Sequence, residues 1–312
     1  MVLLDENNLS IGAPLAFYLS VVAILTLVSI LGNVFILAVN IQDWLKRQNL
    51  SSVDQILVAF SLSSLGLCSS FGSYIFFRFL WPLVLEGFAF TVVFALMLFL
   101  TLSNSWLTAW LCFYFFVKIM NFKFSYFAKL KMTIDVAVPW LIAVSEVVAF
   151  SSTVPLIWSF VRTSPHNSTS CTYTCPIASF HLNTMYYTFI LGFSSNSAFV
   201  IVLSSTVCIV WSLCRHTYRM KKTLSSEGYS QLRAHRKAAQ TVASLLLNYI
   251  VFYVSYILMT SLFSSNHVSI YYWITVWVSQ STAPAMCMVL ILGNSKLSLA
   301  LYKIFGCSPP ID

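Results

Sequence analysis

Long stretches without any charged side chain are the feature that most limits how this chain can fold. Five of them run from Asn7 to Gln42, Gln55 to Phe77, Gly87 to Val117, Thr163 to Cys214 and Ala238 to Ser295. Each is longer than the roughly 20 apolar residues that cross a hydrocarbon core of about 30 Å as a helix. The chain is 8% charged and 59% hydrophobic, a balance that soluble domains do not have. The sequence therefore predicts a membrane protein with several spans.

The need to satisfy backbone hydrogen bonds decides what kind of span these stretches form. In lipid only helices and closed barrels achieve this, and the alternating segments of about 10 residues that mark a barrel are absent. Polar, turn-rich segments, "TSPHNSTSCTYTCP" and "SSNH", divide the two longest stretches. We therefore expect one all-α membrane domain over residues 1–312. Its seven spans are expected at Pro14–Ala38, Val53–Phe77, Gly87–Val117, Ile134–Phe160, Met185–Leu213, Ala238–Leu262 and Ser269–Leu292.

The basic residues predict how these spans are oriented. Of the 17 Lys and Arg residues, Arg78 and Arg162 fall in loops on one side and the other 15 fall on the opposite side. The positive-inside rule makes the second side cytoplasmic, so the N-terminus is expected outside and the C-terminus in the cytosol of a plasma-membrane protein. The net charge of +8 is spread singly between apolar spans, which fits anionic membrane lipid and not a nucleic acid.

Three further features follow from this orientation. The sequon at Asn167 lies in a loop on the predicted outer side, where glycosylation occurs. Cys171 and Cys175 lie in the same oxidising compartment, and the sequence leaves open whether they form a disulfide or stay as free thiols. The segment 294–305 places Leu297, Leu301 and other apolar side chains on one face, which predicts an eighth, interfacial helix.

The first predicted cytoplasmic loop, "IQDWLKRQNLSSVDQI", also contains a helix start. We expect Ser52 to cap the second helix, with Gln55 three residues later completing a capping box. Asp54 lies in the first turn, where the helix dipole favours an anion.

Five sequence blocks give a more specific indication of family. They are "LGNVFILAVNIQDWLKRQNLSSVDQILVAFSLSS", "WLTAWLCFYFFVKIMNF", "SLCRHTYRMKK", "AHRKAAQTVASLLLNY" and "LILGNSKLSLAL". In order and spacing they resemble the bitter taste receptor family (taste receptor type 2). The chain departs from the usual family residues at Ser63-Ser64, Ala198-Phe199 and Met286-Cys287, which suggests a divergent member.

The resemblance implies a seven-helix G-protein-coupled receptor that detects bitter small molecules and couples to a gustducin-like heterotrimeric G protein. Asn33 matches an Asn position of the family and is expected to join an interhelical hydrogen-bond network. Met97 and Thr101 stand where the family usually has Trp and Asn, so the pocket should be softer and less polar than is typical.

The sequence contains no signature of catalysis. None of the five His residues has a second ligand at metal-binding spacing, and HExxH, P-loop and GxSxG motifs are absent. We therefore expect no enzyme, metal or cofactor.

A small-molecule receptor instead needs a mostly apolar cavity with a few polar groups, open to the outside. The outer halves of spans three, five, six and seven supply such residues, and the family resemblance implies a pocket at this end. The expected ligand-binding residues are Met97, Thr101, Asn104, Tyr186, Tyr187, Phe193, Asn196, Tyr253, Tyr256, Trp273, Trp277, Ser279 and Gln280.

A second set of residues is expected to face the G protein. These residues lie near the inner ends of spans three, five and six in the blocks that match the family: Tyr114, Lys118, Arg215, His216, His235 and Lys237.

Glu146 is the one clear ionisable residue near the middle of a predicted span. It could hold a cationic ligand or a buried water network, or it could be protonated or bonded to a Ser or Asn on a neighbouring helix. Two other function classes also remain open, a receptor similar to the vomeronasal type 1 receptors and a seven-span transporter. Agonist-dependent calcium release without substrate uptake would distinguish a receptor from a transporter.

Overall fold

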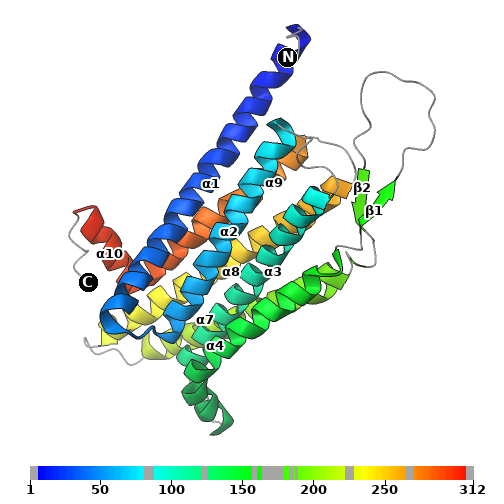
Figure 1. Cartoon of the computed structure of the whole chain (residues 1–312). Helices are drawn as coiled ribbons and strands as arrows, with labels where there is room; N and C mark the ends of the chain where they lie inside the picture. Colours follow the sequence, from blue (N-terminus) through cyan, green and yellow to red (C-terminus); the bar gives the residue numbers. More distant parts are fainter. Residues whose placement is uncertain are drawn as a thin grey trace.

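The fold was analysed in a computed structural model of the chain. It describes residues 6–80, 88–120, 125–156, 160–163, 179–182, 186, 189–221, 228–264 and 270–306. Seven helices in these residues are long and apolar enough to cross a membrane. They form one bundle, with a short further helix at the C-terminal end (Figure 1). The predicted seven-helix receptor-type bundle with an eighth helix is confirmed.

The first four spans are α1 (Glu6–Arg47), α2 (Ser52–Leu80), α3 (Phe88–Ile119) and α4 (Ser125–Thr153). A two-stranded antiparallel hairpin follows, β1 (Phe160–Thr163) with β2 (Ser179–Leu182). The fifth span begins as a π-helix, η2 (Ile190–Ser195), and continues as α7 (Asn196–Lys221). The last elements are α8 (Gly228–Ser264), α9 (Ile270–Gly293) and α10 (Ser295–Ile304).

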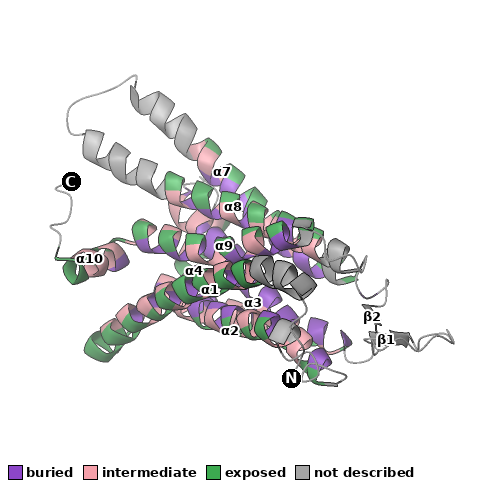
Figure 2. Ribbon diagram, turned by 90° about the horizontal axis from the view of Figure 1, so that it is seen from above, coloured by how far each residue is buried: buried purple, intermediate pink, exposed green. Residues whose placement is uncertain are grey.

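The helices close into a ring in which α1 contacts both α2 and α9, and α8 contacts both α7 and α9. Helix α3 is the most buried of the seven candidate spans, and it packs against α2, α4 and α7. Seen from above, buried residues gather toward the inside of the ring and exposed ones toward its outside (Figure 2). The bundle therefore has a protein core built around α3 and an outer surface for lipid.

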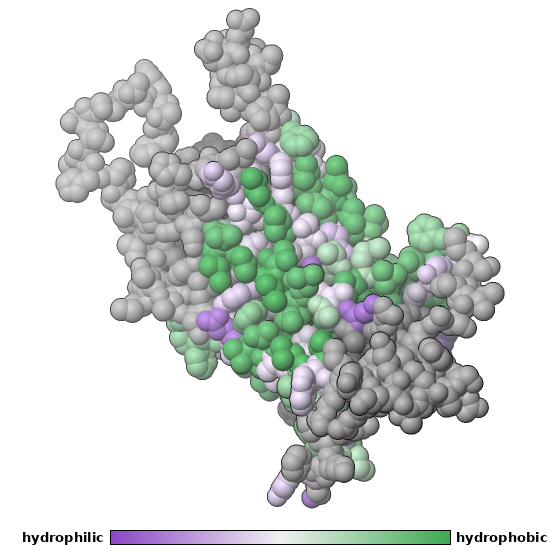
Figure 3. All heavy atoms as spheres, turned by 180° about the vertical axis from the view of Figure 1, so that it is seen from behind, coloured by the Kyte–Doolittle hydropathy of each residue, from purple (hydrophilic) through white to green (hydrophobic). Residues whose placement is uncertain are grey.

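The outer surface is apolar, as a lipid-facing surface must be. Helix α4 alone exposes Trp140, Val147 and Phe150, at 73%, 66% and 63% of their surface. A view from behind shows apolar side chains over much of the described surface (Figure 3). This face of α4 is therefore available to contact lipid and does not pack against the other described helices.

Several predicted boundaries were wrong. The fourth span was expected to reach Phe160, but α4 ends at Thr153 and Phe160 belongs to β1. Pro155 lies two residues beyond the helix end, and its missing N–H and its ring oppose a further turn. Helix α1 extends beyond the predicted Pro14–Ala38 at both ends, and α8 begins ten residues before Ala238. These extensions carry charged residues, which the charge-free criterion had excluded.

The start of α2 also differs from the prediction in its cap. Ser51 Oγ, not Ser52 Oγ, accepts the hydrogen bond from the Asp54 backbone N–H, at 3.2 Å. The Ser52 hydroxyl instead donates to the carboxylate of Asp135 on α4, at 2.9 Å. Gln55 Nε2 bonds to the Leu50 carbonyl, so it does not complete the expected box. Ser52 is itself the first residue of α2, so the capping position falls on Ser51.

Candidate functional site

A narrow cavity with two adjoining compartments lies inside the bundle. The two compartments share part of their lining, including Cys68 on α2, Phe252 on α8 and Thr282 on α9. The outer one, nearer the β-hairpin end, has a volume of about 90 Å³ and is lined by side chains of α2, α3, α8 and α9. Phe94, Met97 and Met259 give it mainly apolar walls, and Thr101 and Gln280 add polar atoms. Its lining fits an apolar guest that makes a few hydrogen bonds.

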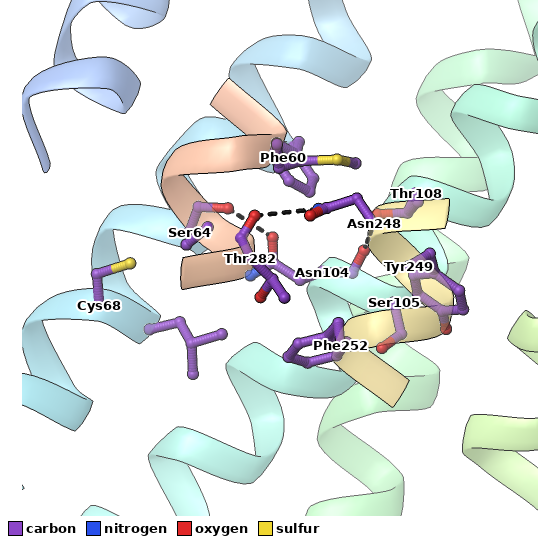
Figure 4. A pocket seen from close by; sticks show the side chains of 13 residues that line it. Phe60, Ser64, Cys68, Asn104, Ser105, Thr108, Asn248, Tyr249, Phe252 and Thr282 are labelled. Carbon is purple, nitrogen blue, oxygen red and sulfur yellow. Dashed lines mark hydrogen bonds between the residues drawn. The ribbon is translucent and has the colours of Figure 1, made fainter. Parts of the chain in front are cut away.

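The inner compartment lies deeper in the bundle and has a volume of about 60 Å³. Figure 4 shows its lining side chains pointing toward a common space from α2, α3, α8 and α9. Two of its hydrogen bonds link different helices. Ser64 Oγ donates to Asn104 Oδ1 at 2.7 Å, and Asn248 Nδ2 donates to the Thr282 carbonyl at 3.0 Å (Figure 4). Polar side chains therefore join the helices around this space.

The volumes decide what the cavity can hold in this conformation. A single water needs about 10–15 Å³ by this measure, so each compartment accommodates a few waters. Pockets for drug-sized ligands are roughly 300–1,000 Å³. A larger guest would therefore have to displace side chains or separate the helices.

Six of the predicted ligand-binding residues line this cavity. Five of them are in the outer compartment and the sixth is in the inner one. They are Met97, Thr101, Tyr256, Ser279 and Gln280, and then Asn104.

The other described members of the predicted set belong to neither compartment. Trp273 stacks on Tyr18 of α1 with ring centroids 5.1 Å apart, and Trp277 packs against Tyr18 and Phe17. These two residues join α9 to α1. The sequence alone did not show that α1 closes the ring against this face of α9.

The described residues predicted from the fifth span also lie outside the two compartments and contact other helices or the surface instead. The Tyr186 hydroxyl donates to the Ser152 carbonyl on α4 at 2.8 Å. Phe193 is 70% exposed and stacks on Phe189. Asn196 Oδ1 accepts from the Tyr253 hydroxyl on α8. Tyr187 lies outside the described residues.

Part of the cavity wall was not predicted. The lining residues missed from the sequence come from α2 and from further positions on α3, α8 and α9. They are Phe60, Ser64, Leu67, Cys68, Phe71, Phe94, Leu98, Ser105, Thr108, Asn248, Tyr249, Phe252, Met259, Thr282, Ala283 and Met286. The run of Ser and Thr on apolar helices was the available signal for many of them, because such hydroxyls are often placed at helix contacts in membranes.

Hydrogen bonds to neighbouring helices were considered for Glu146 and expected for Asn33, and the structure shows one only for Glu146. Ser103 Oγ of α3 donates to Glu146 Oε1 at 2.6 Å, which confirms the expected bond to a Ser on a neighbouring helix. Asn33 is fully buried, but its amide donates to the Ser29 carbonyl within α1. Among the described residues Asn33 Oδ1 has no hydrogen-bond partner, so the expected interhelical network does not form there.

At the opposite end of the bundle, near α10, one carboxylate gathers two of the residues predicted to face the G protein. Asp135 of α4 is 2.6 Å from Lys118 Nζ, and its other oxygen accepts from the Tyr114 hydroxyl at 3.0 Å. Ser52 of α2 donates to that same oxygen. Asp135 therefore connects α4 to α2 and α3 through Tyr114 and Lys118.

A second polar cluster at this end is centred on Lys296 of α10. Its ammonium nitrogen lies 3.0 Å from Asp43 Oδ2, 3.0 Å from Asp54 Oδ2 and 2.8 Å from Asn40 Oδ1. Asn294 caps α10 by accepting from the Lys296 backbone N–H at 3.0 Å. The short helix is therefore fixed to both α1 and α2.

The remaining predicted sites can be located only in part. The backbone of Arg215 and His216 lies on α7, and that of His235 and Lys237 lies on α8. Asn167, Cys171 and Cys175 lie outside the described residues. Their predicted glycosylation and pairing stay predictions.

Comparison with known protein families decides which family this bundle represents. The model of the taste receptor protein (TAS2R) family matches residues 11–308. The chain belongs to the taste receptor protein family. The predicted membership of the type 2 taste receptors is thereby confirmed.

Individual taste receptors also match over most of their length. "Taste receptor type 2 member 7" of Macaca mulatta is 29% identical over 287 residues, which are 89% of this chain and 88% of the relative. "Taste receptor type 2 member 40" of Gallus gallus is 26% identical, covering 88% of this chain and 86% of its own length. "Taste receptor type 2 member 39" of Mus musculus is 26% identical, with 89% and 87% covered. Identities at this level fit a divergent taste receptor, and they favour neither the vomeronasal nor the transporter alternative.

Proposed function

We propose that this taste receptor is a G-protein-coupled receptor that binds bitter small molecules within its helix bundle. The observation that carries the proposal is the two-compartment cavity in a chain of this family. Its walls are mainly apolar, with a few hydroxyl and amide groups among them. Such a lining suits apolar or amphipathic compounds that differ in shape, because Met97 and Met259 can change rotamer to fit them.

Ligand binding and signalling would be coupled through the opening of the cavity. A compound larger than the present volumes can bind only to a wider arrangement of α2, α3, α8 and α9. It therefore favours that arrangement by its difference in affinity for the two forms. In the same proposal the inner ends of α3, α7 and α8 contact a gustducin-like heterotrimeric G protein at the cytosolic face of the plasma membrane. Tyr114, Lys118, Arg215, His216, His235 and Lys237 are the proposed contacts.

A calcium assay in cells that express a chimeric G protein tests the function. We expect at least one compound of a bitter panel to release calcium in cells with the receptor and not in cells without it. No response to any compound, with receptor confirmed at the cell surface, would contradict the proposal. Uptake of the compound without calcium release would indicate a transporter instead.

A pair of methionine variants tests the site. Met97 is 8% exposed and lines the outer compartment, whereas Met288 is 53% exposed on the outer surface of α9. Met97→Ala should change the agonist concentration for half-maximal response about tenfold or more, since it removes a buried wall of the site. Met288→Ala should leave it unchanged. Equal responses of the two variants would show that the agonist does not occupy this cavity.

A further inference from the structure

A row of hydrogen bonds connects the cavity wall to the carboxyl group of Glu146 on α4. Asn104 Nδ2 donates to Ser63 Oγ at 3.1 Å, Ser63 Oγ donates to Ser103 Oγ at 3.0 Å, and Ser103 Oγ donates to Glu146 Oε1 at 2.6 Å. At the cavity end Ser64 Oγ donates to Asn104 Oδ1 at 2.7 Å. We call these five residues the Glu146 network. It crosses from α2 through α3 to α4.

The network has one direction, and the carboxyl group sets it. Ser103 uses its single hydroxyl proton in the bond that it donates to Glu146 Oε1. The Ser103 oxygen is then left to accept from Ser63, and the Ser63 oxygen to accept from the amide of Asn104. That amide also donates to the Leu100 carbonyl at 3.1 Å. Both contacts require the nitrogen of Asn104 to face away from Ser64 and its oxygen to face toward Ser64.

Burial makes this direction hard to reverse. Ser103 is fully buried, and Ser63, Ser64 and Asn104 are 8%, 5% and 8% exposed. Ser63 and Ser103 do not line the cavity, so their hydroxyl groups are satisfied by one another, by Glu146 and by the Leu100 carbonyl, which lies 3.3 Å from Ser63 Oγ. A rotated Asn104 would present its oxygen to the Leu100 carbonyl and its nitrogen to a hydroxyl that needs an acceptor.

The location of Glu146 makes a purely packing role a poor explanation for a carboxyl group. Its neighbours on α4, Val144 and Val147, are 51% and 66% exposed on the lipid-facing surface. An ionisable side chain within a span is unfavourable. An apolar residue would suit that surface better. The carboxyl group is therefore explained best by the hydrogen bond that it accepts.

We propose that Glu146 is a positioning residue for ligand recognition, although it lies outside the cavity. Through Ser103 and Ser63 it fixes the amide of Asn104, so that the inner compartment presents a defined pattern of donors and acceptors to a polar group of the ligand. This inference rests on the proposed function, since it assigns a role within the same cavity. It differs from a counter-ion role, in which the charge itself would contact a cationic ligand.

Six single variants, with Ser151→Ala and Thr101→Ala as controls among them, and two double variants test the inference. Glu146→Leu and Ser103→Ala interrupt the network, and Asn104→Ala removes its end in the cavity. Glu146→Gln keeps an acceptor oxygen without the charge. Ser151→Ala is the matched control for a lost hydroxyl on α4, because Ser151 bonds only to its own helix, at the Val148 carbonyl. The receptor's potency for an agonist with a hydrogen-bonding group is measured for each, after surface expression has been equalised.

The expected pattern is specific. Glu146→Leu and Ser103→Ala should each lower potency about three- to tenfold, the effect of one interhelical hydrogen bond or slightly more. Glu146→Gln should stay near the wild type. The double variant Glu146→Leu with Asn104→Ala should lose no more than Asn104→Ala alone, because both changes act on one interaction. The double variant Glu146→Leu with Thr101→Ala should lose potency by the product of the two single losses. Thr101 bonds to the Met97 carbonyl and is not in the network.

Two results of the potency assay would overturn the inference. One is multiplied losses in the double variant of Glu146 and Asn104. The other is a Glu146→Gln variant as weak as Glu146→Leu toward cationic agonists only, which would indicate a counter-ion. The same double-mutant cycle, measured as thermal stability of the purified receptor without agonist, should show coupling between Glu146 and Asn104, and additive stability losses would contradict the network. If the wild type responds to no compound while the stability cycle shows coupling, the proposed function has failed and the network has not.

Discussion

Replacing Lys296 by Met should destabilise the receptor because three helices meet at its ammonium group. The side chain is 29% exposed, and Asp54, one of its partners, is 9% exposed. Asn40, another partner, is fully buried. Met keeps most of the length and apolar volume of the lysine stem, so the substitution mainly removes the charge and its hydrogen bonds.

The size of the effect follows from these exposures. Exposed ion pairs contribute about 0–1 kcal/mol, and breaking a fully buried pair costs about 3–5 kcal/mol because a charge is left unpaired. The Lys296–Asp54 pair lies between these limits, which gives a loss of about 2 kcal/mol. For a large single domain about 1 kcal/mol lowers the midpoint of thermal unfolding by roughly 2–4 °C. We therefore expect the midpoint to fall by about 4–8 °C.

Thermal unfolding of the purified receptor in detergent measures this shift. Lys303→Met is the matched control, because Lys303 is also on α10 but exposed. It should change the midpoint by less than about 1 °C, as surface substitutions usually do. Replacing Asp54 by Asn in the Lys296→Met background should recover part of the loss, since it removes the unpaired carboxylate. Equal midpoints for Lys296→Met and Lys303→Met would refute the reasoning that this cluster stabilises the bundle.

Three further predictions concern other contacts. Because Cys68 is 3% exposed in the wall of a cavity that holds only a few waters, a thiol-specific methanethiosulfonate should modify it only slowly; a rapid loss of the agonist response that Cys68→Ser abolishes would contradict this burial. Gly293→Ala should weaken the packing of α9 against α8 by about 1–3 kcal/mol in thermal unfolding, because a Cβ at Gly293 would overlap Thr241 Cγ2; an unchanged midpoint would contradict that contact. Asp135→Asn should lower thermal stability by less than Lys296→Met, and the loss should shrink at high salt, because the Asp135 side chain is 44% exposed and its pairing with Lys118 is screened by water and ions; a larger loss than that of Lys296→Met would contradict this order.

The sequence predicted the number of spans because that depends on local composition. Each span is an apolar segment of sufficient length, and burial in lipid requires nothing from distant residues. Helix ends were less predictable because charged residues can continue a helix beyond the membrane, as in α1 and α8. The end of α4 at Thr153 had a local signal in Pro155, which the composition of the segment concealed.

The site was predictable only where a residue's role depends on its own helix. Met97, Thr101 and Asn104 follow one another on the inward face of α3, and all three line the cavity. Trp273 and Trp277 were predicted in the same way, from their place in the outer half of a span, but they pack on Tyr18 of α1. The pairing of Lys296 with Asp54 joins residues that are 242 positions apart. Such partners depend on how the helices are arranged around the ring. The local pattern of a single sequence does not specify that arrangement.

The small volume of the cavity has a consequence for how sensitive the receptor can be. If only a fraction of molecules is in a widened form, every ligand binds with an apparent dissociation constant raised by the inverse of that fraction, about 100-fold if the form is populated at 1%. The penalty is the same for all ligands that need the wider form, so it limits sensitivity without affecting the order in which compounds are recognised. Phe252, which borders both compartments, is therefore a position where a smaller side chain could raise the response to many unrelated compounds at once.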